Sequence, residues 1–237
     1  MPSIRDLRHA NDDIYRNIGI ARGDWSDLYH VNKFGYNAGT SSAFETVWEG
    51  SNIYDYIDAP INITATSASG GTDNGVVVKV EGLDANYNLQ EEILTLAGSG
   101  TATGTKTFKR IFRARVTSGI PDGNITLGDS QTYAQITAGN GQTLMATYTI
   151  PAGKRGYLIK FQGSQQKDQD TTFQLLARPE GADIFQIKGQ WAGRGGQINY
   201  DYPVPLTFAA KTDIEVRVKT GSASEAGALF DLIVETL

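Results

Sequence analysis

The chain has 237 residues, a formal net charge of −5 and a pI of about 5.1. That mild acidity argues against a dedicated nucleic-acid binder, which usually presents a basic face, and no apolar run is long enough to predict a membrane span. Without cysteine the chain forms no disulfide and no thiolate zinc site. Its 27 glycines separate runs that are rich in Thr, Val, Ile, Tyr and Phe, and this composition is typical of all-β proteins.

Residues 1–36 are predicted to be an N-terminal arm, too sparsely apolar to form a core alone. Its first apolar residues fall in pairs three or four apart, a spacing that allows one short helical turn at each end of Ser3–Ile20. Such segments are often ordered by docking onto another molecule. The predicted docking residues are Ile4, Leu7, Ile14, Ile18 and Trp25. The run Asn37–Ser42, NAGTSS, reads as a linker after the arm.

Residues 43–138 are predicted to form a first β unit. Alternating or apolar runs separated by glycine-rich turns indicate its strands. These runs are Phe44–Glu49, Ile53–Ile57, Ile61–Ser67, Val76–Val80, Leu89–Leu96, Thr107–Val116, Ile125–Leu127 and Tyr133–Ile136.

Residues 139–237 are predicted to form a second, jelly-roll-like unit. Its strongest feature is Gln142–Ser164, where two alternating runs flank the turn Pro151–Gly156 and predict a hairpin. Further strands are predicted at Thr172–Arg178, Asp183–Trp191, Gln197–Pro205, Asp213–Lys219 and Ala228–Val234. In the fourth of these, Ile214, Val216 and Val218 alternate with a charged stripe, Glu215, Arg217 and Lys219, that is expected to face solvent. The predicted fold class is therefore all-β, with two consecutive antiparallel sandwich units after an extended arm.

Candidate catalytic residues are few. His9 and His30 are the two histidines, too few for a three-histidine zinc site, and no G-x-S-x-G nucleophile motif occurs. Four carboxylates could in principle pair as in a glycosidase, but charged strand edges are the more economical interpretation; they are Glu45, Glu49, Asp55 and Asp58. We expect no catalytic residue, no metal site and no cofactor.

Short motifs with a functional precedent also have simpler explanations. Lys167–Asp170 has aspartates two apart, as in a calcium loop, but lacks the remaining ligands and is expected to be a solvated tip. Arg22-Gly23-Asp24 is expected to be a polar turn. The glycine clusters Gly139–Gly141 and Gly193–Gly196 do not fit a phosphate-binding loop.

Two surface features leave alternatives open. A basic cluster interleaved with phenylalanines fits nucleic-acid contact, but a solvated strand face or a contact with an acidic neighbour is favoured; it comprises Lys106, Lys109, Arg110, Arg113 and Arg115. Aromatic residues near edge strands fill a core or an interface, or stack on sugar rings. The possible surface or glycan contacts are Trp191, Tyr200 and Tyr202.

Several segments resemble a family of virion structural proteins of tailed phages, especially marine and cyanobacterial phages. They are Phe44–Gly50, Val80–Asn88, Met145–Leu158, Lys211–Arg217 and Phe230–Leu232, and the similarity covers residues 31–237 in the same order. These are turn and strand signatures rather than catalytic ones. The resemblance implies a particle component, such as a capsid decoration, a head or neck fibre, or a tail-associated adaptor, and it supplies no active-site residues.

The expected function is therefore a non-enzymatic structural component of a tailed-phage virion, anchored by its N-terminal arm and assembled in the host cytoplasm. Its expected partners are other virion proteins of the capsid, neck or tail and copies of itself, with a trimer favoured by analogy with phage fibres. We expect no nucleic-acid and no membrane partner. The alternative is a module at a fibre tip that binds a receptor or a host surface glycan; a polysaccharide hydrolase is disfavoured.

Overall fold

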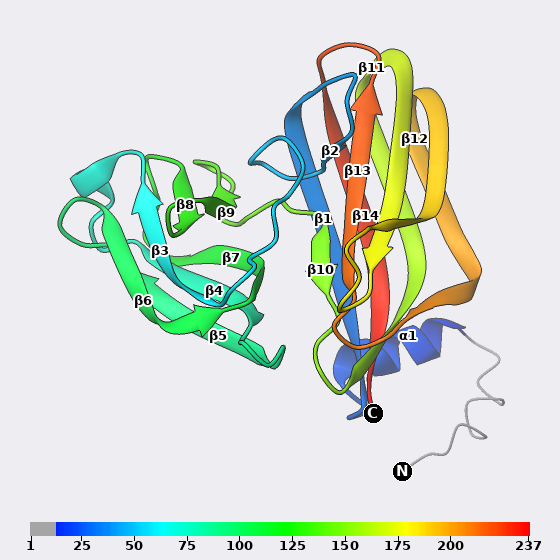
Figure 1. Cartoon of the computed structure of the whole chain (residues 1–237), viewed down its shortest axis with the longest axis horizontal. Helices are drawn as coiled ribbons and strands as arrows, with labels where there is room; N and C mark the ends of the chain where they lie inside the picture. The colour runs from blue at the N-terminus through cyan, green and yellow to red at the C-terminus, as the bar shows by residue number, and fades with distance from the viewer. Residues whose placement is uncertain (1–12) are drawn as a thin grey trace.

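The computed structural model of the chain describes residues 13–237, which form two β lobes (Figure 1). The larger lobe contains a seven-stranded sheet, and the smaller lobe contains a four-stranded and a three-stranded sheet. The pairs within these sheets are antiparallel, which confirms the predicted all-β class. The helix α1 (Asp13–Arg22) lies at the end of the larger lobe that also holds the C-terminus. No helix among residues 13–237 has the length and apolarity needed to cross a membrane.

The larger lobe combines strands from both ends of the chain. Its strands are β1 (Leu28–Thr40), β2 (Glu45–Thr46), β10 (Thr147–Thr149), β11 (Lys154–Arg178), β12 (Gln186–Phe208), β13 (Asp213–Thr220) and β14 (Ser224–Thr236). β11 and β12 form a long hairpin, in which Gly156 pairs with Phe208 at the open end and Ala177 with Gln186 near the loop.

This hairpin is folded over on itself. Residues 154–165 of β11 pair with β14, whereas residues 171–178 pair with β13. Phe161 and Phe173, one from each part, have ring centroids 6.1 Å apart, although an unbroken strand between them would span about 40 Å. On β12 the fold falls at Gly195 and Gly196, whose φ angles of +62° and +76° are open to glycine and strained for other residues.

The fold-over creates two facing layers. The first layer runs β1, β14, residues 154–165 of β11, and the returning half of β12, residues 197–208. The second runs β10 and β2, then β13, residues 171–178 of β11, and the outgoing half of β12, residues 186–194. The inward side chains, which include Phe161, Phe173 and Phe230, form one continuous core between the layers. This is the arrangement of a β-sandwich.

The predicted hairpin at Gln142–Ser164 does not form. The turn is present, but β10 pairs with β13 and β11 begins by pairing with β14. The two runs that flank the turn therefore lie in opposite layers and face the same core. Alternation shows which side of a strand is buried, but it does not show which strand is its neighbour.

The boundary of the predicted arm is also wrong. Residues 28–36 belong to β1, which pairs with β14 from Leu28–Glu235 to Asn37–Ala226. Asn37–Thr40, predicted as linker, continue the same strand. Lys33 and Asn37 are buried on the same face of β1 as Val31, so that polar residues occur on both faces and hide the alternation in the sequence.

The smaller lobe packs two sheets around its own core. Its strands are β3 (Ile61–Ser67), β4 (Val77–Leu83), β5 (Leu89–Thr95), β6 (Thr101–Phe108), β7 (Arg110–Ser118), β8 (Ile125–Gly128) and β9 (Thr132–Ile136). One sheet has the order β6-β3-β8-β9 and the other β5-β4-β7. Phe108, Ile63 and Leu127 are fully buried in its core. The predicted strand at Ile53–Ile57 is instead an irregular segment whose Tyr54 and Tyr56 are buried.

The two units are not simply consecutive. The buried cluster of the smaller lobe runs from Trp48 to Met145, whereas the neighbouring residues Val47 and Ala146 belong to the core of the larger lobe. The smaller lobe is therefore inserted between β2 and β10. Gly35 of β1 lies where the chain leaves and re-enters the larger lobe, since a Cβ there would stand 2.1 Å from the Val47 carbonyl oxygen and 2.4 Å from the Ala146 nitrogen.

Candidate functional site

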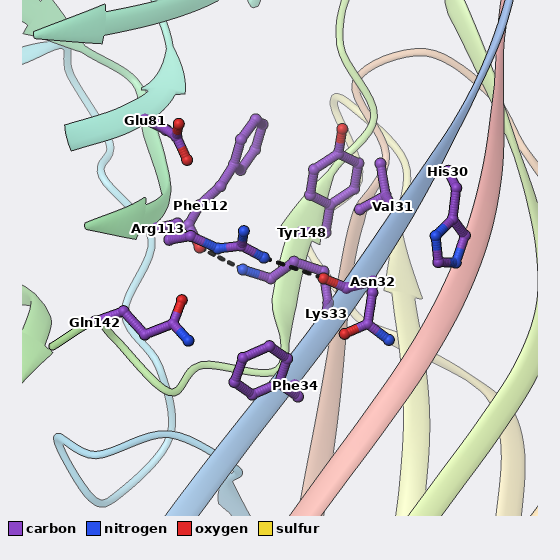
Figure 2. A pocket seen from close by; sticks show the side chains of 10 residues that line it. All are labelled: His30, Val31, Asn32, Lys33, Phe34, Glu81, Phe112, Arg113, Gln142 and Tyr148. Atoms are coloured by element: carbon purple, nitrogen blue, oxygen red, sulfur yellow. Dashed lines mark hydrogen bonds between the residues drawn. The ribbon is translucent and has the colours of Figure 1, made fainter. Parts of the chain in front are cut away.

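A cleft of about 480 Å³ lies at the junction of the two lobes (Figure 2). One wall is β1 of the larger lobe, and the other is formed by β4 and β7 of the smaller lobe. The lining residues are His30, Val31, Asn32, Lys33, Phe34, Glu81, Phe112, Arg113, Gln142 and Tyr148.

Lys33 is a buried basic group in this cleft. Its side chain points from β1 toward β7, and its Nζ donates to the carbonyl oxygen of Phe112 (Figure 2). Only 4% of the residue is exposed. Burial, assisted by the nearby Arg113 guanidinium and opposed by Glu81, lowers the pKa of Lys33 to about 7.

Arg113 makes the reciprocal contact. Its Nη2 donates to the Asn32 carbonyl oxygen at 3.2 Å. A cation from each lobe is thus bonded to the backbone of the other lobe, with Lys33 bonded to β7 and Arg113 to β1. Because backbone carbonyls are fixed by their sheets, these bonds hold the two strands at a set separation.

His30 is directed away from Lys33, to the opposite side of β1 (Figure 2). Its Nε2 lies 3.1 Å from Oδ1 of Asp231, and Asn32 Nδ2 donates to the same oxygen at 2.6 Å. Burial raises the pKa of Asp231, but the bonds from His30 and Asn32 outweigh it, so that the net pKa lies below its usual value. His30 therefore sits beside a carboxylate, but Lys33 does not share that contact. A catalytic site would need an acid or base within reach of the reacting group.

A buried network of charged side chains also connects the two lobes. Arg110 of β7 donates to Asp213 of β13 from Nε at 2.8 Å and from Nη2 at 2.9 Å. Arg178 Nη2 and Thr149 Oγ1 also donate to the Asp213 carboxylate, at 2.8 and 2.6 Å. Arg110 and Asp213 are 6% and 3% exposed. Such a two-pronged guanidinium–carboxylate pair fixes geometry as well as charge.

Glu215 lies beside this network and is fully buried. Tyr56 of the smaller lobe donates its hydroxyl proton to Oε2 at 3.2 Å, and Arg217 Nε contacts Oε1. Burial raises the pKa of Glu215 to about 7, although Arg217 acts in the opposite direction. The expectation that Glu215 and Arg217 face solvent is therefore wrong for Glu215, because the smaller lobe covers this face of β13.

The basic cluster of the smaller lobe is occupied by contacts within the protein. Besides Arg110 and Arg113, Arg115 Nη2 lies 2.9 Å from Glu81, and Lys106 Nζ donates to the Glu91 carbonyl at 2.8 Å. Lys109 Nζ donates to the Asp58 carbonyl oxygen. Contact with an acidic neighbour, one of the favoured explanations, applies to Arg110 and Arg115.

The predicted aromatic residues come together on β12. The Trp191 and Tyr200 ring centroids are 5.7 Å apart, and those of Tyr200 and Tyr202 are 4.8 Å apart. One indole face is covered, because Trp191 stacks on Phe161 at 4.1 Å with an interplanar angle of 9°. Tyr200 is 42% exposed. Burial raises the pKa of Tyr202 to about 12, and its buried hydroxyl has no hydrogen-bond partner within the described part of the chain.

The predicted docking residues can be placed only in part. Ile4 and Leu7, like His9, lie outside the described residues, and the Ile14 side chain is likewise outside them. Ile18 on α1 is 39% exposed. Trp25 follows the helix, and its ring lies against Gly19. The predicted polar turn at Arg22-Gly23-Asp24 is confirmed, since it ends α1 and has a φ of +75° at Gly23.

Other predicted sites are structural. Asp168 pairs with Arg194 at 3.0 Å where the β11–β12 hairpin folds over. Among residues 13–237, no cluster of three or more His, Asp or Glu side chains is arranged to hold a metal ion. Glu49 accepts from Asn140 and from the Leu144 backbone, and Asp55 accepts from Gln131.

Three residues at the lobe junction were not predicted from the sequence to take part in a buried site: Lys33, Asp213 and Glu215. Lys33 shares a face of its strand with Val31 and Gly35, which is a weak sign that this face is covered. Asp213 and Glu215 give no such sign, because alternation with Ile214 and Val216 looks the same whether the charged face meets water or a second lobe.

Comparisons with known proteins do not identify the chain. Neither protein-family profiles nor curated proteins give a match. Among solved structures, the cowpea mosaic virus top component (empty particles) shares 8% identity over 73% of this chain and 80% of its own, with a TM-score of 0.23. The isomalto-dextranase of Arthrobacter globiformis shares 11% over 87% and 35%, with a TM-score of 0.27. The PBSX exported protein XepA shares 9% over 87% and 85%, with a TM-score of 0.20. At these TM-scores the likenesses establish no common fold, and no function follows from them.

Proposed function

We propose that this chain is a non-enzymatic structural component of a tailed-phage virion, as a capsid decoration, a head or neck fibre, or a tail-associated protein. The observation that carries the structural role is the use of the buried charges. Lys33, Arg113 and the Arg110–Asp213 pair all connect one lobe to the other. The placement in a phage particle rests on the sequence resemblance of residues 31–237.

A buried lysine of lowered pKa is also a common feature of catalytic sites. In this cleft, however, the described contact of Lys33 Nζ is a backbone carbonyl rather than an acid or a base. Proton transfer through Lys33 would need an acid or a base in contact with its Nζ. The arrangement therefore supports a clamp between the lobes better than it supports catalysis.

The test is to locate the chain on particles of the phage that encodes it. Particles banded by density gradient are probed with an antibody against the chain and then reconstructed by electron cryomicroscopy. We expect the chain to remain with the particles and to fill repeated two-lobed density at symmetry-related positions. Its absence from the washed particles, with the protein free in the lysate, contradicts the proposal.

A second candidate is a receptor- or glycan-binding module at a fibre tip. It is favoured by the grouping of Trp191, Tyr200 and Tyr202 at an exposed strand, because aromatic faces stack on sugars. Free protein that blocks phage adsorption, and loses that effect in Tyr200→Ala, supports this candidate. A polysaccharide hydrolase is tested by the release of reducing sugar.

A further inference from the structure

β12 forms an open edge along one side of the larger lobe. The smaller lobe lies on the opposite side, next to β1, β2 and β10 (Figure 1). Within residues 13–237, both halves of β12 pair with β11 alone, so that their other edges carry unpaired backbone groups. Proteins generally cover or blunt long edges of this kind because they pair readily with other strands.

The core is also incompletely closed along this edge. The inward-facing side chains of β12 pack on the core but remain only half-buried; they are Trp191, Ile198, Tyr202 and Leu206. Ile187 and Tyr200 are 54% and 42% exposed. A neighbouring strand would therefore bury apolar surface as well as satisfy the backbone.

The edge is irregular in two places. On the outgoing half, Gly189 pairs with Leu175 and Ile187 with Leu176, so that Lys188 is the extra residue of a β-bulge. The returning half is blunted more strongly. The β11–β12 register passes from Lys160–Asp201 to Leu158–Leu206, so that residues 202–205 bulge away from the ladder. This bulge contains Pro203 and Pro205, which have no N–H to donate. Regular pairing is therefore open to residues 189–194 of the outgoing half and to residues 197–201 of the returning half.

The fold-over sets the direction of these two segments. The outgoing and returning halves run in opposite directions, one in each layer. Rotation of a second copy about an axis parallel to the strands brings its returning half beside the outgoing half of the first, in antiparallel orientation. A twofold axis makes this contact twice between two copies, and a threefold axis makes it once with each neighbour.

We propose that the chain associates with copies of itself by antiparallel pairing of the outgoing half of β12 with the returning half of β12 in the next copy. The pairing joins the second layer of one copy to the first layer of the other in a continuous sheet. It does not depend on a role in a virus particle.

Charge and shape select a register. Paired residues in an antiparallel ladder point to the same face, so that Trp191, which faces the core, must meet another inward residue. Placing it opposite Ile198 of the second copy also places Gln190 opposite Asn199 and brings Lys188, the bulged residue, next to Asp201. In the described part of the chain neither Lys188 nor Asp201 takes part in an ion pair. Two exposed opposite charges thus become neighbours across the contact.

The same register places Gly189 opposite Tyr200 of the second copy. Gly189 has no side chain of its own, and the Trp191 ring already occupies the space that a Cβ would need, at 2.4 Å. Trp191 therefore covers Gly189 already, and Tyr200 of the second copy would pack beside that ring.

The test is a charge swap measured by sedimentation equilibrium of the full chain, from 1 to about 100 µM. We expect the wild type to form a closed oligomer. Lys188→Asp and Asp201→Lys should each raise the dissociation constant at least about fivefold, because each places like charges next to one another. The double variant should recover to within about twofold of the wild type. Lys106→Asp in the smaller lobe is the matched control and should change nothing.

Circular dichroism and melting midpoints verify that each variant is folded. Amide hydrogen exchange adds a local readout: residues 189–201 should become protected as concentration rises, whereas 202–205 should not. A wild type that is monomeric at 100 µM overturns the proposal. An oligomer that both single variants leave intact, or that the double variant fails to restore, overturns the pairing.

Discussion

Arg110 in β7 and Asp213 in β13 form a two-pronged ion pair across the lobe junction, with donor–acceptor distances of 2.8 and 2.9 Å. Breaking a buried pair by removing one partner leaves an uncompensated charge. Asp213→Asn should therefore lower the free energy of unfolding by about 3–5 kcal/mol, measured by urea denaturation. The control is Asp168→Asn, whose partner Arg194 is exposed, and a change within about 0.5 kcal/mol is expected there. Equal effects of the two substitutions would contradict a structural role for the network.

Glu215 should make the protein less stable as pH rises from about 4.5 to 7. Its pKa is about 7 in the folded protein against a model value of 4.5, so that the folded state holds a proton which the unfolded state releases in this range. The contribution is complete below pH 4.5 and lost as pH rises through 7, with a decline on the order of 3 kcal/mol. Urea denaturation at pH steps measures it. Glu215→Gln should flatten this range, and an unchanged slope in that variant would assign the effect to another group.

Lys33 acts in the opposite direction and in a different pH range. Its folded-state pKa is about 7 against a model value of 10.5, so that the unfolded state binds the additional proton between these values. Its contribution is complete above pH 10.5 and lost as pH falls through 7. Lys33→Met, which keeps the volume, should remove the rise in stability above pH 7. If the rise persists in this variant, Lys33 does not titrate as its burial predicts.

Gly35 and Gly39 of β1 offer a matched pair of substitutions. A Cβ at Gly35 would collide with the backbone of Val47 and Ala146, whereas at Gly39 it would meet nothing within 4 Å. Gly35→Ala should lower the free energy of unfolding by more than about 2 kcal/mol, as overpacking against fixed backbone does. Gly39→Ala should be neutral or slightly stabilising. Thermal denaturation of both variants decides the matter, and similar midpoints would mean that β1 moves to accommodate the methyl group.

Truncation tests the predicted anchoring role of the N-terminal arm. Deletion of residues 1–22 should leave a folded, β-rich protein, with a loss limited to contacts such as that of Ile20, which is 8% exposed. Deletion of residues 1–36 should prevent folding, because it removes the part of β1 that pairs with β14. If the predicted arm, residues 1–36, anchors the chain through its first 22 residues, the shorter deletion should also abolish incorporation into particles. Normal copy number after that deletion would place the anchor elsewhere.

Alternation in the sequence predicts individual strands well. β3 coincides with its predicted run, and β13 exceeds its own by one residue. β14 includes its predicted run but begins four residues before it and ends two residues after it. The runs are visible because one face of each strand meets an apolar core. The same alternation does not identify which strands pair with each other. It does not reveal that β11 and β12 fold over, or that β10 and β11 lie in different layers. It also fails where both faces of a strand are covered, as for Glu215, since a face buried by a second lobe can keep its charges.

Pairing of β1 with β14 joins the two ends of the described chain, from Leu28 with Glu235 to Thr40 with Ser224. During synthesis β1 leaves the ribosome long before its partner strand exists. The smaller lobe, whose buried cluster lies within residues 48–145, can close in the meantime. The larger lobe must wait for β14, so that emergence of residues 224–236, rather than of any earlier segment, starts its closure. A ribosome that stalls before residue 224 should therefore hold a folded smaller lobe and an exposed, protease-sensitive β1.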